Sequence, residues 1–254
     1  MPVFFSRSWW WTTLLVIAAV GVMARLGQWQ LERLAERRAF NARVAAQLEQ
    51  PPLALAGPAL DAGLAEMEYR SAVVTGQYDF AQQVALRNQV RQGALGAHLL
   101  TPLIISGTER AVLVNRGWIP ATDARPQAWR RYDEPGPVTV RGRLRRSQSA
   151  PDFGGVPDPA GRLDLWNLVN VERIRAQVSY PLLPVYLQQA PDPAWTGLPE
   201  RAEPALDLSE GSHLGYAVQW FLFAGLLGLG YPFYVWETER QAAPGLGRRQ
   251  GASR

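Results

Sequence analysis

Two residue types are missing from this chain of 254 residues: it has no cysteine and no lysine, so all 26 basic residues are arginine. Without cysteine there is no thiolate nucleophile, no disulfide framework and no cysteine-ligated zinc site. Without lysine there is no Schiff base and no phosphate-binding P-loop. Histidine is scarce, because His98 and His213 are the only two. A metal site would therefore depend on carboxylates and at most two imidazoles.

Charge is missing from two long stretches near the ends of the chain, residues 9–23 and 214–236. Mean hydropathy is only −0.14 although 47% of the residues are hydrophobic, so the apolar residues are concentrated there. About 20 helical residues cross a bilayer core. The second stretch has that length, and the first reaches it over residues 9–26 if Arg25 extends to the interface. We expect two membrane-spanning helices, the first an uncleaved anchor because no clean cleavage site follows it.

The second apolar stretch contains a strip of small residues, namely Ala224, Gly225, Gly228 and Gly230. Small residues allow two membrane helices to approach closely. The strip predicts packing against the first helix, and exposure to lipid is the alternative.

The charged residues are distributed unevenly. Residues 27–213 carry 20 Arg against 20 Asp plus Glu, so the net charge of +4 arises at the ends and gives no argument for nucleic-acid binding. Arginines follow the second apolar stretch and acidic residues precede it. The positive-inside rule then places both termini in the cytoplasm and the middle of the chain outside. No Arg-rich, Ser-rich amphipathic leader precedes the first span, so a mitochondrial import signal is not evident, and we expect the inner membrane of a bacterium. The arginines that follow the first stretch oppose this topology, but long translocated segments respond little to charge.

The middle of the chain has the pattern of one domain that is rich in strands. The helix begun in the first span continues to just before Pro51. Strand-like runs then cover residues 69–78, 83–88, 98–105, 111–118, 138–146 and 183–188. The third and fourth runs are expected to form a hairpin, residues 170–177 a short helix, and residues 57–64, 152–162 and 189–204 loops. The prediction is an antiparallel, β-rich α+β or barrel-like domain.

These expectations divide the chain into five segments. They are a cytoplasmic N-terminus (1–8), a first transmembrane helix (9–26), an extracytoplasmic β-rich domain with a juxtamembrane helix (27–212), a second transmembrane helix (213–236) and a cytoplasmic basic tail (237–254).

The usual catalytic constellations are missing. The sequence has no G-x-S-x-G, no H-E-x-x-H and no G-x-G-x-x-G that opens a helix after a strand. A Ser-His-Asp triad in the domain would need His98, which we interpret as a structural histidine. Asp133 and Glu134 are adjacent in a predicted turn and look solvated. The sequence therefore predicts a protein that is not an enzyme.

Arg141, Arg143 and Arg145 alternate along one predicted strand and so share one face. They are typical of a solvated face or of an edge strand that resists aggregation. The functional alternative is a contact with acidic groups, which could be lipid phosphates, a partner protein or the carboxylates of a cofactor.

His213 stands at the outer start of the second span. Tyr216 and Trp220 follow at i+3 and i+7, so the three side chains share one helical stripe. An imidazole among aromatic rings at a membrane surface could be an axial ligand of heme iron. It could equally be an interfacial polar residue that caps the helix beside Ser212. The residues by themselves leave both interpretations open.

Six sequence blocks occur in one order between the two spans: LGQWQLERL (26–34), VTGQYD (74–79), NQV (88–90), GAHLLTPL (96–103), VNRGWIP (114–120) and HLGYAVQW (213–220). With a span at each end, this arrangement resembles the Surfeit locus protein 1 family of cytochrome c oxidase assembly factors. The resemblance covers most of residues 10–236. Two positions depart from the expected pattern: Ala97 where a tyrosine is expected, and Asn170 where an aspartate is common.

The resemblance implies an extracytoplasmic domain on two membrane helices and a role in maturing a heme–copper oxidase. It implies that the chain holds or delivers heme a to the catalytic subunit, with His213 as the candidate iron ligand. Trp29, Tyr216 and Trp220 would line the heme, and Arg25 would pair with its propionates. The implied partners are the oxidase catalytic subunit or an assembly intermediate, the lipid bilayer and heme a synthase. A scaffold that assembles oxidase subunits without binding heme is the alternative.

Overall fold

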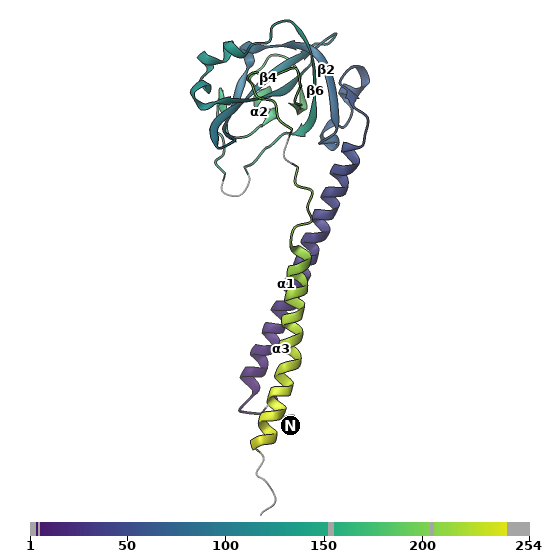
Figure 1. Ribbon diagram of the computed structural model, residues 1–254, viewed down its shortest axis with the longest axis vertical. Coiled ribbons are helices and arrows are strands. Elements are labelled where there is room, and N and C mark those ends of the chain that lie inside the picture. Colours follow the sequence, from purple (N-terminus) through teal and green to yellow (C-terminus); the bar gives the residue numbers. More distant parts are fainter. Residues whose placement is uncertain (1–3, 5, 152–154, 204–205, 243–254) are drawn as a thin grey trace, which may run out of the picture. The chain divides into compact units, whose positions relative to one another are not determined.

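The computed structural model describes residues 4, 6–151, 155–203 and 206–242 (Figure 1). The chain divides into two compact units, one made of Met1–Ala42 with Leu208–Arg254 and the other of Arg43–Asp207. Parts of two predicted loops, and the tail arginines Arg248, Arg249 and Arg254, lie outside the described residues.

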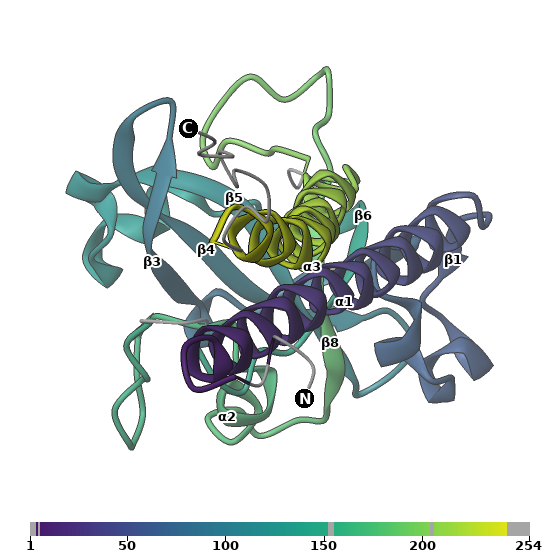
Figure 2. The ribbon, with the colours of Figure 1, turned by 90° about the horizontal axis from the view of Figure 1, so that it is seen from below.

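The first unit is built on two long helices, α1 (Trp10–Leu48) and α3 (His213–Ala242), of which α1 continues into the second unit. Their contact depends on small residues. A β-carbon added at Gly27 would lie only 2.9 Å from the ring of Phe221, so glycine is what permits this approach. Ala217 and Ala224 are buried on the same side of α3. Figure 2 shows the two helices from below.

The predicted strip of small residues is only partly correct. A β-carbon at Gly228 would lie 3.8 Å from Val20 of α1, and Ala224 is buried. Gly225 and Gly230, in contrast, have no neighbouring atom within 4 Å of such a β-carbon. The reason is helical periodicity, because residues one or two positions away from the contact face point elsewhere.

Both helices are long and apolar enough to cross a membrane, judged by length and composition. Large apolar side chains on them are exposed, with Leu15 at 69% and Leu229 at 80%. Helices in the core of a water-soluble protein bury such side chains. Away from the small-residue contact, the two helices thus present apolar surfaces to their surroundings.

The second unit holds a small β-barrel. Strands β2, β6, β8, β5 and β4 follow one another in the sheet, and a pairing of β2 with β4 closes the ring. Their bounds are β2 Ser71–Tyr78, β4 Ala94–Ile105, β5 Ala111–Pro120, β6 Pro137–Arg146 and β8 Leu182–Gln189. Strands β1 (Leu53–Ala54), β3 (Val84–Arg91) and β7 (Leu165–Trp166) extend the sheet beyond the ring.

Short helices connect the strands. Helix α2 covers Val171–Arg175, and Asn170 caps it by accepting a hydrogen bond from the backbone of Arg173. The 3₁₀ helices are η2 (Gly57–Asp61), η3 (Leu64–Met67), η4 (Phe80–Gln82), η5 (Ala121–Asp123) and η6 (Pro126–Tyr132).

The barrel is filled because side chains alternate along each strand. In β6, Val140 and Leu144 are buried in the core, while Arg141, Arg143 and Arg145 occupy the other face. The shared face predicted for these arginines is confirmed. The edge-strand alternative is wrong, because β6 pairs with β2 on one side and with β8 on the other.

Most predicted elements are confirmed. The six strand-like runs correspond to β2, β3, β4, β5, β6 and β8, and the predicted hairpin is the antiparallel pair β4–β5. The purely antiparallel sheet is wrong, because β8 runs parallel to β5 and two short parallel pairs, β1–β2 and β3–β7, flank the barrel. Strand β8 arrives through α2 and a long connection, so no tight turn fixes its direction.

Candidate functional site

His213 is the first residue of α3, and its imidazole contacts α1 at Gln30. The Nδ1 atom lies 2.9 Å from Gln30 Oε1. An amide oxygen only accepts hydrogen bonds, so Nδ1 carries the proton and donates it. In the neutral imidazole, Nε2 then keeps the free lone pair, which is the form in which an imidazole binds a metal ion.

A glycine in the turn before α3 lies beside the Nε2 edge of the imidazole and places no side chain there. Gly211 has a φ of +67°, which glycine adopts without strain. A β-carbon at this position would lie 3.5 Å from Cδ2 and 3.7 Å from Nε2 of His213. A side chain at position 211 would therefore be in van der Waals contact with this edge of the ring.

Three polar contacts fasten the segment before α3 to α1. Arg38 donates from Nε and Nη2 to the two carboxylate oxygens of Glu210, both at 2.8 Å. Arg37 donates to the carbonyl oxygen of Ser209 at 2.9 Å, and Asn41 to that of Leu208 at 2.6 Å. The hydrogen bonds from Arg38 hold the pKa of Glu210 below its usual range. Together these contacts fix where α3 begins and so where His213 meets Gln30.

The aromatic residues predicted to share a site with His213 present ring surface to the exterior. Tyr216 is 51% exposed and Trp29 is 41% exposed, while Trp220 is half-buried and packs edge-on against Phe223. Tyr216 and Trp220 follow His213 at one-turn and two-turn spacing on α3. Trp29 adjoins Gln30 on α1, and its ring lies 5.8 Å from the guanidinium of Arg33.

Arg25, the predicted partner for propionates, is exposed and pairs with Glu32 at 3.3 Å. The pair is open to solvent, so it is easily exchanged for another acidic partner.

A second polar cluster lies inside the barrel, centred on Arg116 of β5. Its side chain is fully buried, and it donates to Glu134 Oε1 and to Gln83 Oε1, both at 2.9 Å. Its guanidinium carbon lies 5.0 Å from the ring centroid of Tyr78. Arg201 donates to the other oxygen of Glu134 at 2.8 Å. The expectation that Glu134 is solvated is therefore wrong, because its carboxylate bridges two arginines.

His98 of β4 is held as a neutral base. Burial, with a smaller contribution from the charge of Arg91, lowers its pKa to about 4. The side-chain amide of Asn115 donates to His98 Nδ1 at 3.1 Å. This partner is neither the hydroxyl nor the carboxylate of a Ser-His-Asp triad. Among the residues that the structure describes, no group of three or more Asp, Glu or His is placed to hold a metal ion.

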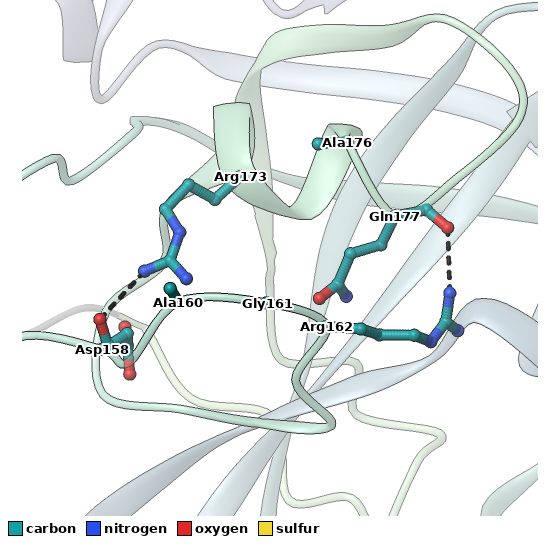
Figure 3. A pocket seen from close by; sticks show the side chains of 7 residues that line it. All are labelled: Asp158, Ala160, Gly161, Arg162, Arg173, Ala176 and Gln177. Atoms are coloured by element: carbon teal, nitrogen blue, oxygen red, sulfur yellow. Dashed lines mark hydrogen bonds between the residues drawn. The ribbon is translucent and has the colours of Figure 1, made fainter.

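A shallow groove of about 580 Å³ runs beside α2 (Figure 3). Arg162 donates to the backbone oxygen of Gln177 at 3.0 Å and to Gln82 Oε1 at 3.1 Å. Arg173 donates to the backbone oxygen of Asp158 at 3.1 Å. These bonds fasten the loop that contains Asp158 onto α2, so the arginines of this groove serve the fold.

The sequence singled out His213, Tyr216, Trp220, Trp29 and Arg25. Within the described part of the chain, no hydrogen bond, ion pair or ring contact joins two of these five, and His213 instead bonds to a residue that was not singled out, Gln30. The signal for Gln30 was present, because it lies in the block at residues 26–34. Its role could not be recognised, since nothing local relates it to a residue 183 positions away. The Arg116 cluster was missed for the same reason.

Comparisons with known proteins agree on one family. A family model described as the SURF1 family matches residues 17–225. A SURF1-like protein of Monosiga brevicollis is 27% identical over 212 residues, which cover 79% of this chain and 78% of that protein. An uncharacterized SURF1-like protein of Mycobacterium tuberculosis is 32% identical over 222 residues, 83% of this chain and 77% of that one. Surfeit locus protein 1 of Homo sapiens is 24% identical over 213 residues, 77% of this chain and 68% of that one.

Proposed function

The chain belongs to the SURF1 family, and on this premise we propose that it assists the assembly of cytochrome c oxidase by holding heme a for the catalytic subunit. The observation that carries the proposal is the hydrogen bond from His213 Nδ1 to Gln30. It fixes the imidazole in the tautomer that leaves Nε2 free to coordinate iron.

The residues around His213 fit a heme by their chemistry. The two exposed rings, Tyr216 and Trp29, offer apolar surface for a macrocycle, and Gly211 places no side chain beside Nε2. When bound, heme would supply an iron that accepts a nitrogen ligand. It would also supply two carboxylates of its own, which attract cations. Arg25 can exchange its solvent-exposed pair with Glu32 for such a carboxylate.

The proposed role requires the protein only to retain heme a and then to release it. His213 would bind through one nitrogen, its hydrogen bond to Gln30 would set the direction of that nitrogen, and the aromatic rings would exclude water from one side. A single protein ligand gives moderate affinity, which suits transfer to a partner. No proton transfer or bond cleavage by a side chain is required, so we propose that the protein is not an enzyme.

We further propose that α1 and α3 cross the inner membrane of a bacterium, with both termini in the cytoplasm and the barrel outside. The exposed apolar side chains of both helices support a lipid environment. The arginine content of the segment after α3 supports the orientation. The catalytic subunit of the oxidase or an assembly intermediate would then meet the protein at the outer face, with heme a synthase as a source of the cofactor.

The test is complementation of a strain from which the gene has been deleted. We expect its membranes to lose cytochrome oxidase activity and to show a reduced or shifted heme a band in the reduced-minus-oxidised spectrum. The wild-type gene and His98→Gln should restore both, whereas His213→Gln should not. The two variants replace the only two histidines by the same residue, so they form a matched pair.

The outcomes separate the two assembly roles. Full restoration by His213→Gln would favour a scaffold that binds no heme. Unchanged membranes in the deletion strain would contradict an assembly role altogether.

A further inference from the structure

The arginine cluster of the barrel contains more positive than negative charge. Arg116 is fully buried and Arg201 is 7% exposed, yet they share the single carboxylate of Glu134. Neither Nε atom has a hydrogen-bond partner among the residues that the structure describes. The neighbouring Asp133 interacts with Arg116 and also with Arg130, so three arginines share two carboxylates. Arginine does not lose its proton in proteins, and a buried charge without a counter-charge is costly.

A hollow of about 340 Å³ opens beside this cluster. Arg201 lines it together with Arg141, Thr139 and Gln189. This volume falls at the lower end of the range for small-molecule sites, about 300–1,000 Å³. Gln189 is 7% exposed and accepts a weak hydrogen bond, 3.4 Å long, from Tyr78. Arg201, which already shares the carboxylate of Glu134 with Arg116, therefore borders a cavity with polar walls.

Arg141 differs from its neighbours on the same strand face. Arg143 pairs with Glu203 at 2.8 Å, and Arg145 pairs with Glu68 at 3.3 Å. Arg141 has no acidic partner within the part of the chain that the structure describes, and its side chain lines the hollow. Two guanidinium groups thus border one cavity, and neither has a carboxylate to itself.

We propose that this hollow, lined by Arg141, Arg201, Thr139 and Gln189, binds a carboxylate group. Guanidinium groups recognise carboxylates and phosphates, both of which accept paired hydrogen bonds. Asp192 also lines the hollow. Arg116, Arg141 and Arg201 against Glu134 and Asp192 leave one positive charge, which a singly charged carboxylate balances and a doubly charged phosphate would exceed. The carboxylate belongs either to a small organic acid or to the end of a peptide chain.

The experiment is a ¹⁹F NMR titration of trifluoroacetate with the full-length protein in detergent micelles. We expect saturable line broadening that acetate reverses. Arg141→Gln should weaken the binding about 10–100-fold, the usual effect of losing a charged hydrogen-bonding partner. Asp192→Asn should strengthen it about threefold by removing an exposed like charge. Arg143→Gln is the matched control, because it removes the same charge from the same strand face without touching the hollow, and it should change nothing.

Competition identifies the source of the carboxylate. Displacement by N-acetylglycine at much lower concentration than by acetate would assign the hollow to the end of a peptide chain, and the reverse order would assign it to a small organic acid. N-acetylglycinamide, which lacks the charge, should not compete. Equal broadening in wild type and Arg141→Gln, or stronger displacement by inorganic phosphate than by acetate, would overturn the proposal. Neither result depends on heme, so this test and that of the assembly role can fail separately.

Discussion

At the scale of single residues, the account depends on one imidazole and the amide that orients it. His213 donates from Nδ1 to Gln30, and this bond determines which ring nitrogen is free. Replacing a group that orients a metal ligand commonly lowers the affinity for the metal about 10–100-fold. Gln30 is thus expected to matter for heme binding although it would not touch the iron.

The first prediction concerns Gln30. Gln30→Leu should weaken heme a binding about 10–100-fold, because the imidazole loses the acceptor that fixes its tautomer and direction. Gln30→Glu keeps an acceptor oxygen and should bind normally. Gln28→Leu is the control, since Gln28 lies on the same helix but reaches only Glu32, at 3.5 Å. Optical titration of the purified proteins with heme a compares their affinities. Equal affinity of Gln30→Leu and wild type would contradict the role of Gln30.

The second prediction concerns His98, whose pKa in the folded protein is lowered to about 4. An unfolded chain has a histidine pKa of about 6.5, so between these values the unfolded state binds more protons and is favoured as the pH falls. The stability contributed by keeping His98 neutral is complete above about pH 6.5 and declines toward pH 4. The loss should reach about 2–3 kcal/mol by pH 4.

Thermal unfolding of the full-length protein at pH 5 and pH 7 measures this effect. His98→Gln should flatten the pH dependence between the two values, and His213→Gln should leave it unchanged. A pH dependence that is the same in His98→Gln and wild type would show that another group is responsible.

At the scale of elements, the pairing of α1 with α3 rests on a close approach at Gly27. The ring of Phe221 occupies the space that a β-carbon would need. Gly27→Leu should therefore destabilise the helix pair by about 1–3 kcal/mol, the usual cost of overpacking. Gly230→Leu makes the same substitution where nothing lies within 4 Å, and it should have little effect. Unfolding by SDS in mixed micelles compares them, and equal midpoints would argue against packing at Gly27.

The elements themselves could largely be predicted from the sequence. Alternation along residues 138–146 predicted β6 and the outward face of its arginines, because side chains in a strand repeat every two residues. The direction of β8 could not be predicted, since alternation is the same for parallel and antiparallel strands. Strands of two residues, such as β7, are too short to leave a pattern.

The polar contacts could not be predicted from local patterns. Glu134 stands in a turn beside prolines and looks solvated, yet it bridges arginines 18 and 67 positions away. The two ends of the His213–Gln30 bond are separated by most of the chain. His213 itself could be singled out, because its place at the start of an apolar stretch and its aromatic neighbours are local features.

At the scale of the whole molecule, the absence of cysteine makes the proposed topology easy to test. Ser106→Cys places one thiol in an exposed turn of the barrel, and Gln241→Cys places one near the end of α3. A maleimide that cannot cross membranes should label the first variant in intact spheroplasts and the second only after lysis. The reverse pattern, or labelling of both in intact cells, would contradict the proposed orientation.

The heme content of the purified protein shows whether His213 holds heme a. The full-length wild type, His213→Gln and His98→Gln would be expressed in a host that makes heme a, and heme per protein measured by the pyridine hemochromogen spectrum. We predict that wild type and His98→Gln carry heme a, and that His213→Gln retains about one tenth or less, because the only axial nitrogen is lost. Equal heme content in His213→Gln and wild type would contradict the account, even if the fold and the family stand.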